Sequence, residues 1–221
     1  MNWKCNIEVH GLENIPKKGP YIVAGNHLRM QSGLVRLVYD AFVISMLVQK
    51  HGDERIRWLA RPTMAFDIPG VGRKVPIPLR DFSMKVFERK YGALMIDTSL
   101  GEQAKHKITE ESIAALVNGD VVGIMPEGDI YDVLSKAKKG LYYIAAGYNR
   151  NHTQNPVKVV PVAAWGMEKD VVGKKRPVTV HFGKPVVIDE KEDPQEAVDQ
   201  VMIEIARNLP DKYRGYYKSR I

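Results

Sequence analysis

The chain has few of the features that mark secreted, membrane-spanning or metal-dependent proteins. Its single cysteine, Cys5, excludes an internal disulfide, and we expect it to be a buried structural thiol in a reducing cytoplasm. No apolar run reaches the ~18 residues that a membrane-spanning helix needs. The segment 1–6 has no apolar stretch of the kind found in secretory signals, so none is expected.

Motifs for common cofactors are also missing. The chain has no Walker loop, no Gly-x-Gly-x-x-Gly turn and no Cys/His spacing typical of zinc sites. Its six histidines are scattered along the sequence. We therefore expect neither a bound cofactor nor a metal ion.

The composition is that of a globular protein with a basic surface. The 221 residues are 44% hydrophobic and 27% charged, with no internal repeat, so we expect one domain over 1–221. The formal charge of +7 favours an anionic partner: nucleic acid, an acidic membrane surface or a phosphorylated substrate. No nucleic-acid motif accompanies this charge, so we do not expect the protein to bind nucleic acid. The tail 212–220 mixes cations with tyrosines, as membrane-interface segments do, although a solvated terminus is the default expectation.

Apolar runs and turn signals alternate along the chain. They predict strands at 21–27, 56–60, 93–96, 121–125, 157–163 and 178–182, and helices at 40–50, 81–90, 105–118, 139–148 and 194–209. Strands that alternate with helices form parallel sheets covered on their faces. The expected fold is a single α/β domain with a mixed, largely parallel sheet flanked by helices.

Two strand ends carry side chains suited to catalysis. Gly25-Asn26-His27 closes the first apolar strand, and Glu127-Gly128 closes a strand about a hundred residues later. Imidazole has an unperturbed pKa close to neutrality, so His27 is suited to take and return a proton. A lone strand-end histidine is commonly structural, and Glu127 could equally cap the next segment or pair with Lys138 or Lys139. Both interpretations remain open on these residues alone.

Six segments in order resemble the motifs of the PlsC-type glycerolipid acyltransferase family. They are residues 11–16 with 19–27, 93–97, 125–128, 138–140, 159–163 and 180–185. The resemblance implies acyl transfer from acyl-CoA or acyl carrier protein to a hydroxyl of a lipid or polyol, as in 1-acylglycerol-3-phosphate acyltransferases. It implies a peripheral protein on the inner face of an anionic membrane. A non-catalytic lipid-binding relative and an acyl thioesterase are the alternatives.

The family uses a histidine as general base and an aspartate to orient it. His27 matches the base, but the family's aspartate position, five residues later, is Ser32 here. Ser32 would then cap a helix starting near Gly33. We favour Asp40, because the helix 41–50 has its own cap and stop, although Asp40 could be only that cap.

The resemblance also implies a substrate pocket. Glu127, Gly128, Asn26, Ser32 and Lys139 are the residues we expect to line it. Two phosphate-reading arginines of the family are replaced, one by Thr98 and the other within Asp129-Ile130. Because arginine binds phosphate bidentately, we expect an acceptor other than a phosphorylated glycerol.

Overall fold

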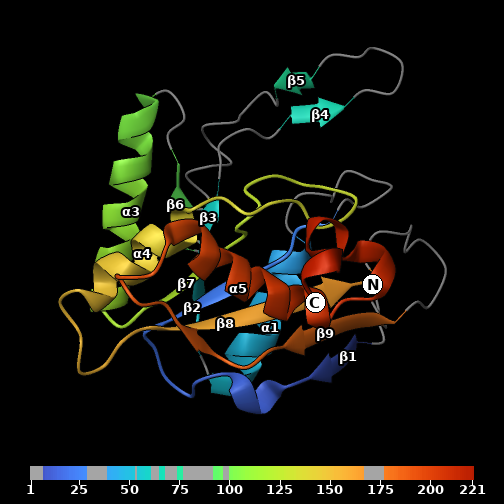
Figure 1. Cartoon of the computed structure of the whole chain (residues 1–221), viewed down its shortest axis with the longest axis horizontal. Coiled ribbons are helices and arrows are strands. Elements are labelled where there is room, and N and C mark those ends of the chain that lie inside the picture. The colour runs from blue at the N-terminus through green and yellow to red at the C-terminus, as the bar shows by residue number, and fades with distance from the viewer. Residues whose placement is uncertain are drawn as a thin grey trace.

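A sheet of eight strands forms the centre of the protein (Figure 1). The computed structural model describes residues 7–28, 39–52, 54–60, 65–67, 74–76, 92–96, 100–166 and 177–221. The strands of this sheet are β1 (Ile7–His10), β2 (Tyr21–Gly25), β3 (Ile56–Ala60), β6 (Leu94–Met95), β7 (Val121–Ile124), β8 (Lys158–Trp165), β9 (Val178–Phe182) and β10 (Val186–Val187). The α-helices are α1 (Tyr39–Gly52), α3 (Glu102–Val117), α4 (Gly140–Asn149) and α5 (Pro194–Arg207). None of these described helices is both long and apolar enough to cross a bilayer.

The strand order confirms the predicted mixed, largely parallel sheet. The strands follow the order β1-β9-β8-β2-β7-β3-β6, and β10 pairs with β8. All pairs from β8 to β6 are parallel, while β9 and β10 run antiparallel to β8. Tyr21 of β2 pairs with Val121 of β7, and Ala24 pairs with Ile124. The carboxyl ends of these two strands therefore lie side by side.

The two faces of the sheet are covered by different helices. Along β2, Ile22 and Ala24 belong to a core cluster formed with α3, α4 and α5, whereas Tyr21 and Val23 belong to a second cluster that includes α1. The alternation follows from the two-residue period of a strand. A strand buried on both faces needs an apolar residue at every position, which explains the unbroken run 21–24.

Most predicted elements are present, with shifts at their ends. The bounds of β3 and β9 match the prediction, and the helix ends move by a few residues. The sequence did not predict β10, nor the antiparallel hairpin of β4 (Ala65–Asp67) and β5 (Lys74–Pro76), which forms a separate two-stranded sheet. Such short strands among Pro and Gly residues are read as turns. The predicted helix 81–90 lies outside the described residues.

The tail packs against the protein, so the default expectation of a solvated terminus is wrong. The chain after α5 forms two 3-10 helices, η3 (Asp211–Tyr213) and η4 (Gly215–Arg220), that lie against α5 (Figure 1). Tyr213 and Tyr217 are buried in the same core cluster as α5. The reason is a buried acceptor: the Tyr217 hydroxyl donates to Asp199 Oδ1 on α5 at 2.7 Å.

A glycine at the centre of the sheet gives a stability test. A Cβ at Gly123 would lie 2.5 Å from Trp58 Cδ2 and 2.6 Å from Ile56 Cγ2. We expect Gly123→Ala to lower the free energy of unfolding by about 1–3 kcal/mol, because the packed neighbours must shift. Urea unfolding measures the change. Gly140→Ala is the control, since its Cβ would meet only Ile124 Cδ1 at 4.0 Å. Equal stability of the two variants would contradict the packing argument.

Candidate active site

His27 and Asp40 form a hydrogen-bonded pair at the carboxyl end of β2. Gly25 faces α1, where its Cβ would lie 3.4 Å from Ile44 Cδ1. His27 is two residues beyond Gly25, and Asp40 is one helical turn before Ile44. Gly25 and His27 therefore lie on the same side of the chain, where Gly25 faces Ile44 and His27 faces Asp40. His27 Nδ1 lies 2.5 Å from Asp40 Oδ2.

The Asp40 carboxylate also determines which imidazole nitrogen carries hydrogen. Asp40 is 8% exposed, and its second oxygen, Oδ1, accepts from the Ala41 backbone N–H at 2.8 Å. A carboxylate can only accept, so Nδ1 of His27 is the donor in the pair. In the neutral imidazole the free lone pair is consequently on Nε2.

The surrounding charges favour the protonated form of His27. Burial alone would lower the pKa of His27, but the hydrogen bond and charge of Asp40, together with the charges of Glu127 and Asp129, raise it above its ordinary value of 6.5. A proton accepted at Nε2 would therefore be stabilised at this site.

Glu127 bonds the backbone of His27 from the neighbouring strand end. The two residues continue the register of β2 and β7, and Glu127 Oε2 accepts from the His27 N–H at 3.1 Å. Its other oxygen, Oε1, accepts from the Ser135 N–H at 2.8 Å. The side chain is fully buried, and burial raises its pKa to about 7 although both hydrogen bonds oppose the shift.

A tight turn brings Glu127 back toward β2. The Gly128 N–H donates to the Met125 carbonyl at 2.9 Å, and Gly128 adopts a φ of 67°. Other residues rarely adopt this left-handed conformation, which explains the glycine at the strand end. After the turn, Tyr131 N–H donates to the His27 carbonyl at 3.2 Å. The backbone of His27 is thus hydrogen-bonded at both its N–H and its carbonyl group.

Comparisons with known proteins identify the class. The acyltransferase family model matches residues 6–165, which is more than half of the chain. The chain belongs to the acyltransferase family. Its fold resembles the crystal structure of the 1-acyl-sn-glycerophosphate (LPA) acyltransferase PlsC from Thermotoga maritima, with a TM-score of 0.58 and 20% sequence identity. That match covers 92% of this chain and 70% of PlsC. No curated protein sequence matches the chain.

Two residues predicted to bind the substrate of this acyltransferase have other partners. The Asn26 side chain donates to the Ala164 carbonyl at 2.9 Å and accepts from the Ala164 N–H at 2.8 Å. It replaces the backbone pairing that β2 would have made with β8 one step further. Lys139 is exposed, and its charge joins the backbone hydrogen bonds from Glu196 and Gln195 in lowering the pKa of Asp193.

The remaining predictions differ in what the acyltransferase structure says of them. Ser32 and Thr98 lie outside the described residues, as do Cys5 and Asp97. Asp129 is exposed, and its Oδ1 accepts from the Ile130 N–H at 2.8 Å. Sequence reasoning missed Tyr131 and Ser135, whose backbone N–H groups donate to His27 and Glu127. No side-chain pattern signals such contacts.

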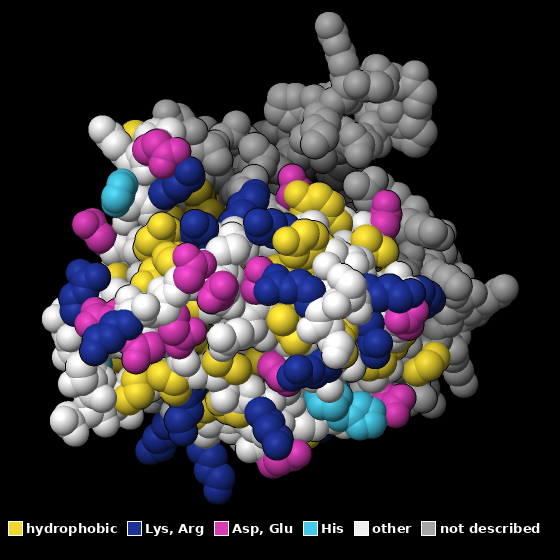
Figure 2. Space-filling model, viewed as in Figure 1, with side chains coloured by type: hydrophobic (Ala, Val, Ile, Leu, Met, Phe, Trp, Pro, Cys, Tyr) yellow, Lys and Arg dark blue, Asp and Glu magenta, His cyan; other side chains and the backbone are white. Residues whose placement is uncertain are grey.

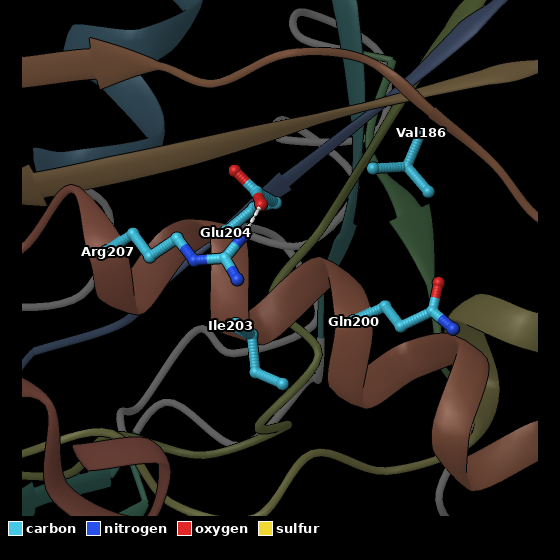
Figure 3. Close-up of a pocket in the computed structure, with 5 residues that line it drawn as sticks. All are labelled: Val186, Gln200, Ile203, Glu204 and Arg207. Carbon is cyan, nitrogen blue, oxygen red and sulfur yellow. Dashed lines mark hydrogen bonds and ion pairs between the residues drawn. The ribbon is translucent and has the colours of Figure 1, made fainter. Parts of the chain in front are cut away.

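A separate pocket lies away from the His27 pair. It is lined by Val186, Gln200, Ile203, Glu204 and Arg207, between β10 and the outer face of α5 (Figure 3). Val186 pairs with Val159 near the start of β8, whereas His27 follows the carboxyl end of β2. In the part of the chain that the structure describes, no three metal-ligating side chains gather.

The His27–Asp40 pair predicts a shift in titration. We expect Asp40→Asn to lower the pKa of His27, because the hydrogen bond and charge that most strongly oppose the effect of burial are then lost. An NMR titration of the His27 ring protons measures the value. Asp129→Asn is the control and should lower the pKa less, since Asp129 acts through charge alone. An unchanged His27 pKa in Asp40→Asn would refute this account.

Proposed function

We propose that the protein transfers a fatty acyl group from a thioester to a lipid or polyol hydroxyl, with His27 as general base. The observation that carries the proposal is the 2.5 Å hydrogen bond between His27 Nδ1 and the Asp40 carboxylate. It directs the basic Nε2 lone pair away from Asp40. The acyltransferase family membership supports the reaction class.

The proposed step resembles the histidine–aspartate chemistry of serine hydrolases, with the acceptor supplying the hydroxyl. His27 Nε2 takes the hydroxyl proton as the acceptor oxygen attacks the thioester carbonyl carbon. A carbon–oxygen bond forms, the tetrahedral intermediate collapses, and the carbon–sulfur bond breaks. The imidazolium then returns its proton to the leaving thiolate. Asp40 stabilises the imidazolium between these two transfers.

Loss of the base should lower turnover by orders of magnitude. We expect His27→Ala to lower kcat about 10²- to 10⁴-fold, the range for a general base, and Asp40→Asn to lower it at least about tenfold. Thiol release from long-chain acyl-CoA or acyl carrier protein, with a panel of hydroxyl acceptors, measures the rate. His106→Ala on the exposed face of α3 is the control.

Three results would overturn parts of this proposal. Full turnover in His27→Ala would show that His27 is not the general base. Thiol release that is independent of any acceptor would indicate a thioesterase. Bound long-chain lipid with no turnover in the unaltered protein would indicate a lipid-binding relative.

We further propose that the acceptor carries no phosphate next to the reacting hydroxyl. Asp129 and Ile130 stand where the resembling family has Thr-Arg, so the family's guanidinium at that step is replaced by an apolar side chain. Asp40, Glu127 and Asp129 all act on His27 as negative charges. A phosphate dianion placed beside the carboxylates of Asp40 and Asp129 would meet repulsion rather than a bidentate partner.

A pair of acceptors that differ only in phosphate tests this proposal. We expect kcat/KM for a monoacylglycerol to exceed that for lysophosphatidate of the same chain by at least about tenfold, which corresponds to roughly 1.4 kcal/mol. Both acceptors are presented in the same neutral vesicles, and acylated product is quantified. Ile130→Arg should narrow the ratio by restoring a phosphate reader, with Ile130→Leu as its control. A preference for lysophosphatidate in the unaltered protein would refute the proposal.

We also propose that the protein reaches its acceptor on the inner face of an anionic membrane, as a peripheral protein. The formal charge of +7 supports this partner. Exposed apolar side chains lie on the loop that bonds His27 and on the segment bonded to that loop: Tyr131, Val133 and Tyr216. Lys136 Nζ lies 6.0 Å from the centre of the Tyr216 ring. Figure 2 shows Lys and Arg side chains spread among hydrophobic ones over the face that carries α5.

A further inference from the structure

The loop between β7 and α4 bonds the backbone of His27 once directly and once through Glu127. This connecting loop, residues 128–139, bonds the His27 carbonyl through the Tyr131 N–H at 3.2 Å. It bonds Glu127 Oε1 through the Ser135 N–H at 2.8 Å, and Glu127 in turn accepts from the His27 N–H. The position of His27 therefore depends on where this loop lies.

The end of the chain fixes the same loop on both sides of Ser135. The Leu134 N–H donates to the Tyr213 carbonyl at 2.9 Å, and the Tyr216 N–H donates to the Leu134 carbonyl at 2.8 Å. The Ala137 N–H donates to the Tyr217 hydroxyl at 3.0 Å. These bonds come from the terminal segment, residues 211–220.

A buried carboxylate anchors the terminal segment to α5. Asp199 is 3% exposed, and its Oδ1 accepts from the Tyr217 hydroxyl at 2.7 Å and from Gln195 Nε2 at 2.9 Å. Its Oδ2 accepts from the Arg220 guanidinium. Gln195 Nε2 also donates to the Ala137 carbonyl at 3.2 Å, so the network returns to the connecting loop.

We propose that the terminal segment positions His27 for catalysis, acting through Leu134, Ser135 and Glu127. The backbone of Leu134 is hydrogen-bonded to the terminal segment. The next residue, Ser135, donates its N–H to the Glu127 carboxylate that bonds His27. Glu127 is fully buried, so losing the Ser135 N–H would leave one of its oxygens without a partner. Displacement of a general base by about 1 Å costs up to about 10² in rate. The catalytic consequence rests on the proposed function, whereas the bonded series does not.

Gly215 allows the contact to be broken without altering the site. It has a φ of 44°, and a Cβ there would lie 2.1 Å from the Leu134 carbonyl oxygen and 2.9 Å from the Leu134 nitrogen. Gly215→Ala must therefore push the terminal segment away from Leu134. Gly101→Ala is the matched control, because Gly101 has a φ of 55° and its Cβ would meet no atom within 4 Å. Both variants strain a backbone of positive φ, and only Gly215→Ala collides with the loop.

Two measurements on the full chain test the proposal. We expect Gly215→Ala to lower kcat at least about tenfold relative to Gly101→Ala, with KM for the thioester within about twofold. We also expect hydrogen exchange of the His27 amide to accelerate, while the amide of Val23 in the middle of β2 stays protected. Tyr217→Phe, which keeps the ring and removes both hydroxyl bonds, should show the same two changes more weakly.

The result that overturns the proposal is specific. If Gly215→Ala and Tyr217→Phe both leave His27 amide exchange as it is in Gly101→Ala, the terminal segment does not position His27. Equal kcat in a folded Gly215→Ala and in Gly101→Ala would overturn it as well. Should the unaltered protein show no turnover, the proposed function fails by itself. His27 amide exchange then still decides the positioning link.

Discussion

The parallel pairing of β2 with β7 is the constraint on which the candidate site depends. Because the two strands run in the same direction and in register, their carboxyl ends bring His27 and Glu127 together from distant parts of the chain. The same strand alternation that packs Tyr21 and Val23 against α1 also turns His27 toward Asp40. A slip by one residue would move His27 to the opposite face of the sheet, away from Asp40. The site therefore inherits its precision from apolar packing.

Much of this arrangement could be predicted from local patterns. Continuous apolar runs bounded by turns identify β2 and β7, since strands buried on both faces leave no polar position inside. The cap and stop around residues 40–50 identify α1, and this made Asp40 the favoured partner of His27. The structure brings Asp40 to within hydrogen-bond distance of that ring. Strand ends carrying His27 and Glu127 were visible because glycine and a polar side chain follow apolar residues.

Other contacts could not be predicted because they join backbone groups across long distances. Glu127 was expected to shape the substrate pocket, yet both its oxygens accept backbone hydrogens, from His27 and Ser135. Asn26 uses its amide to continue the pairing between β2 and β8. The tail was expected in solvent because that is the default for a terminus, while its cations and tyrosines suited a membrane interface. A single buried acceptor, Asp199, changes that balance, and composition does not reveal which carboxylate will be buried.

The docked terminal segment also bears on how the protein is made. The backbone of Leu134 is hydrogen-bonded to Tyr213 and Tyr216, which lie about 80 residues further along the chain. On the ribosome, β2, α1 and β7 emerge well before these partners do, since synthesis proceeds at roughly 5–20 residues per second. Until they emerge, Leu134 and Ala137 of the connecting loop lack the hydrogen-bond partners that the terminal segment supplies. The histidine is thus translated early, and the loop that supports it gains these partners only after residues 213–217 have been synthesised.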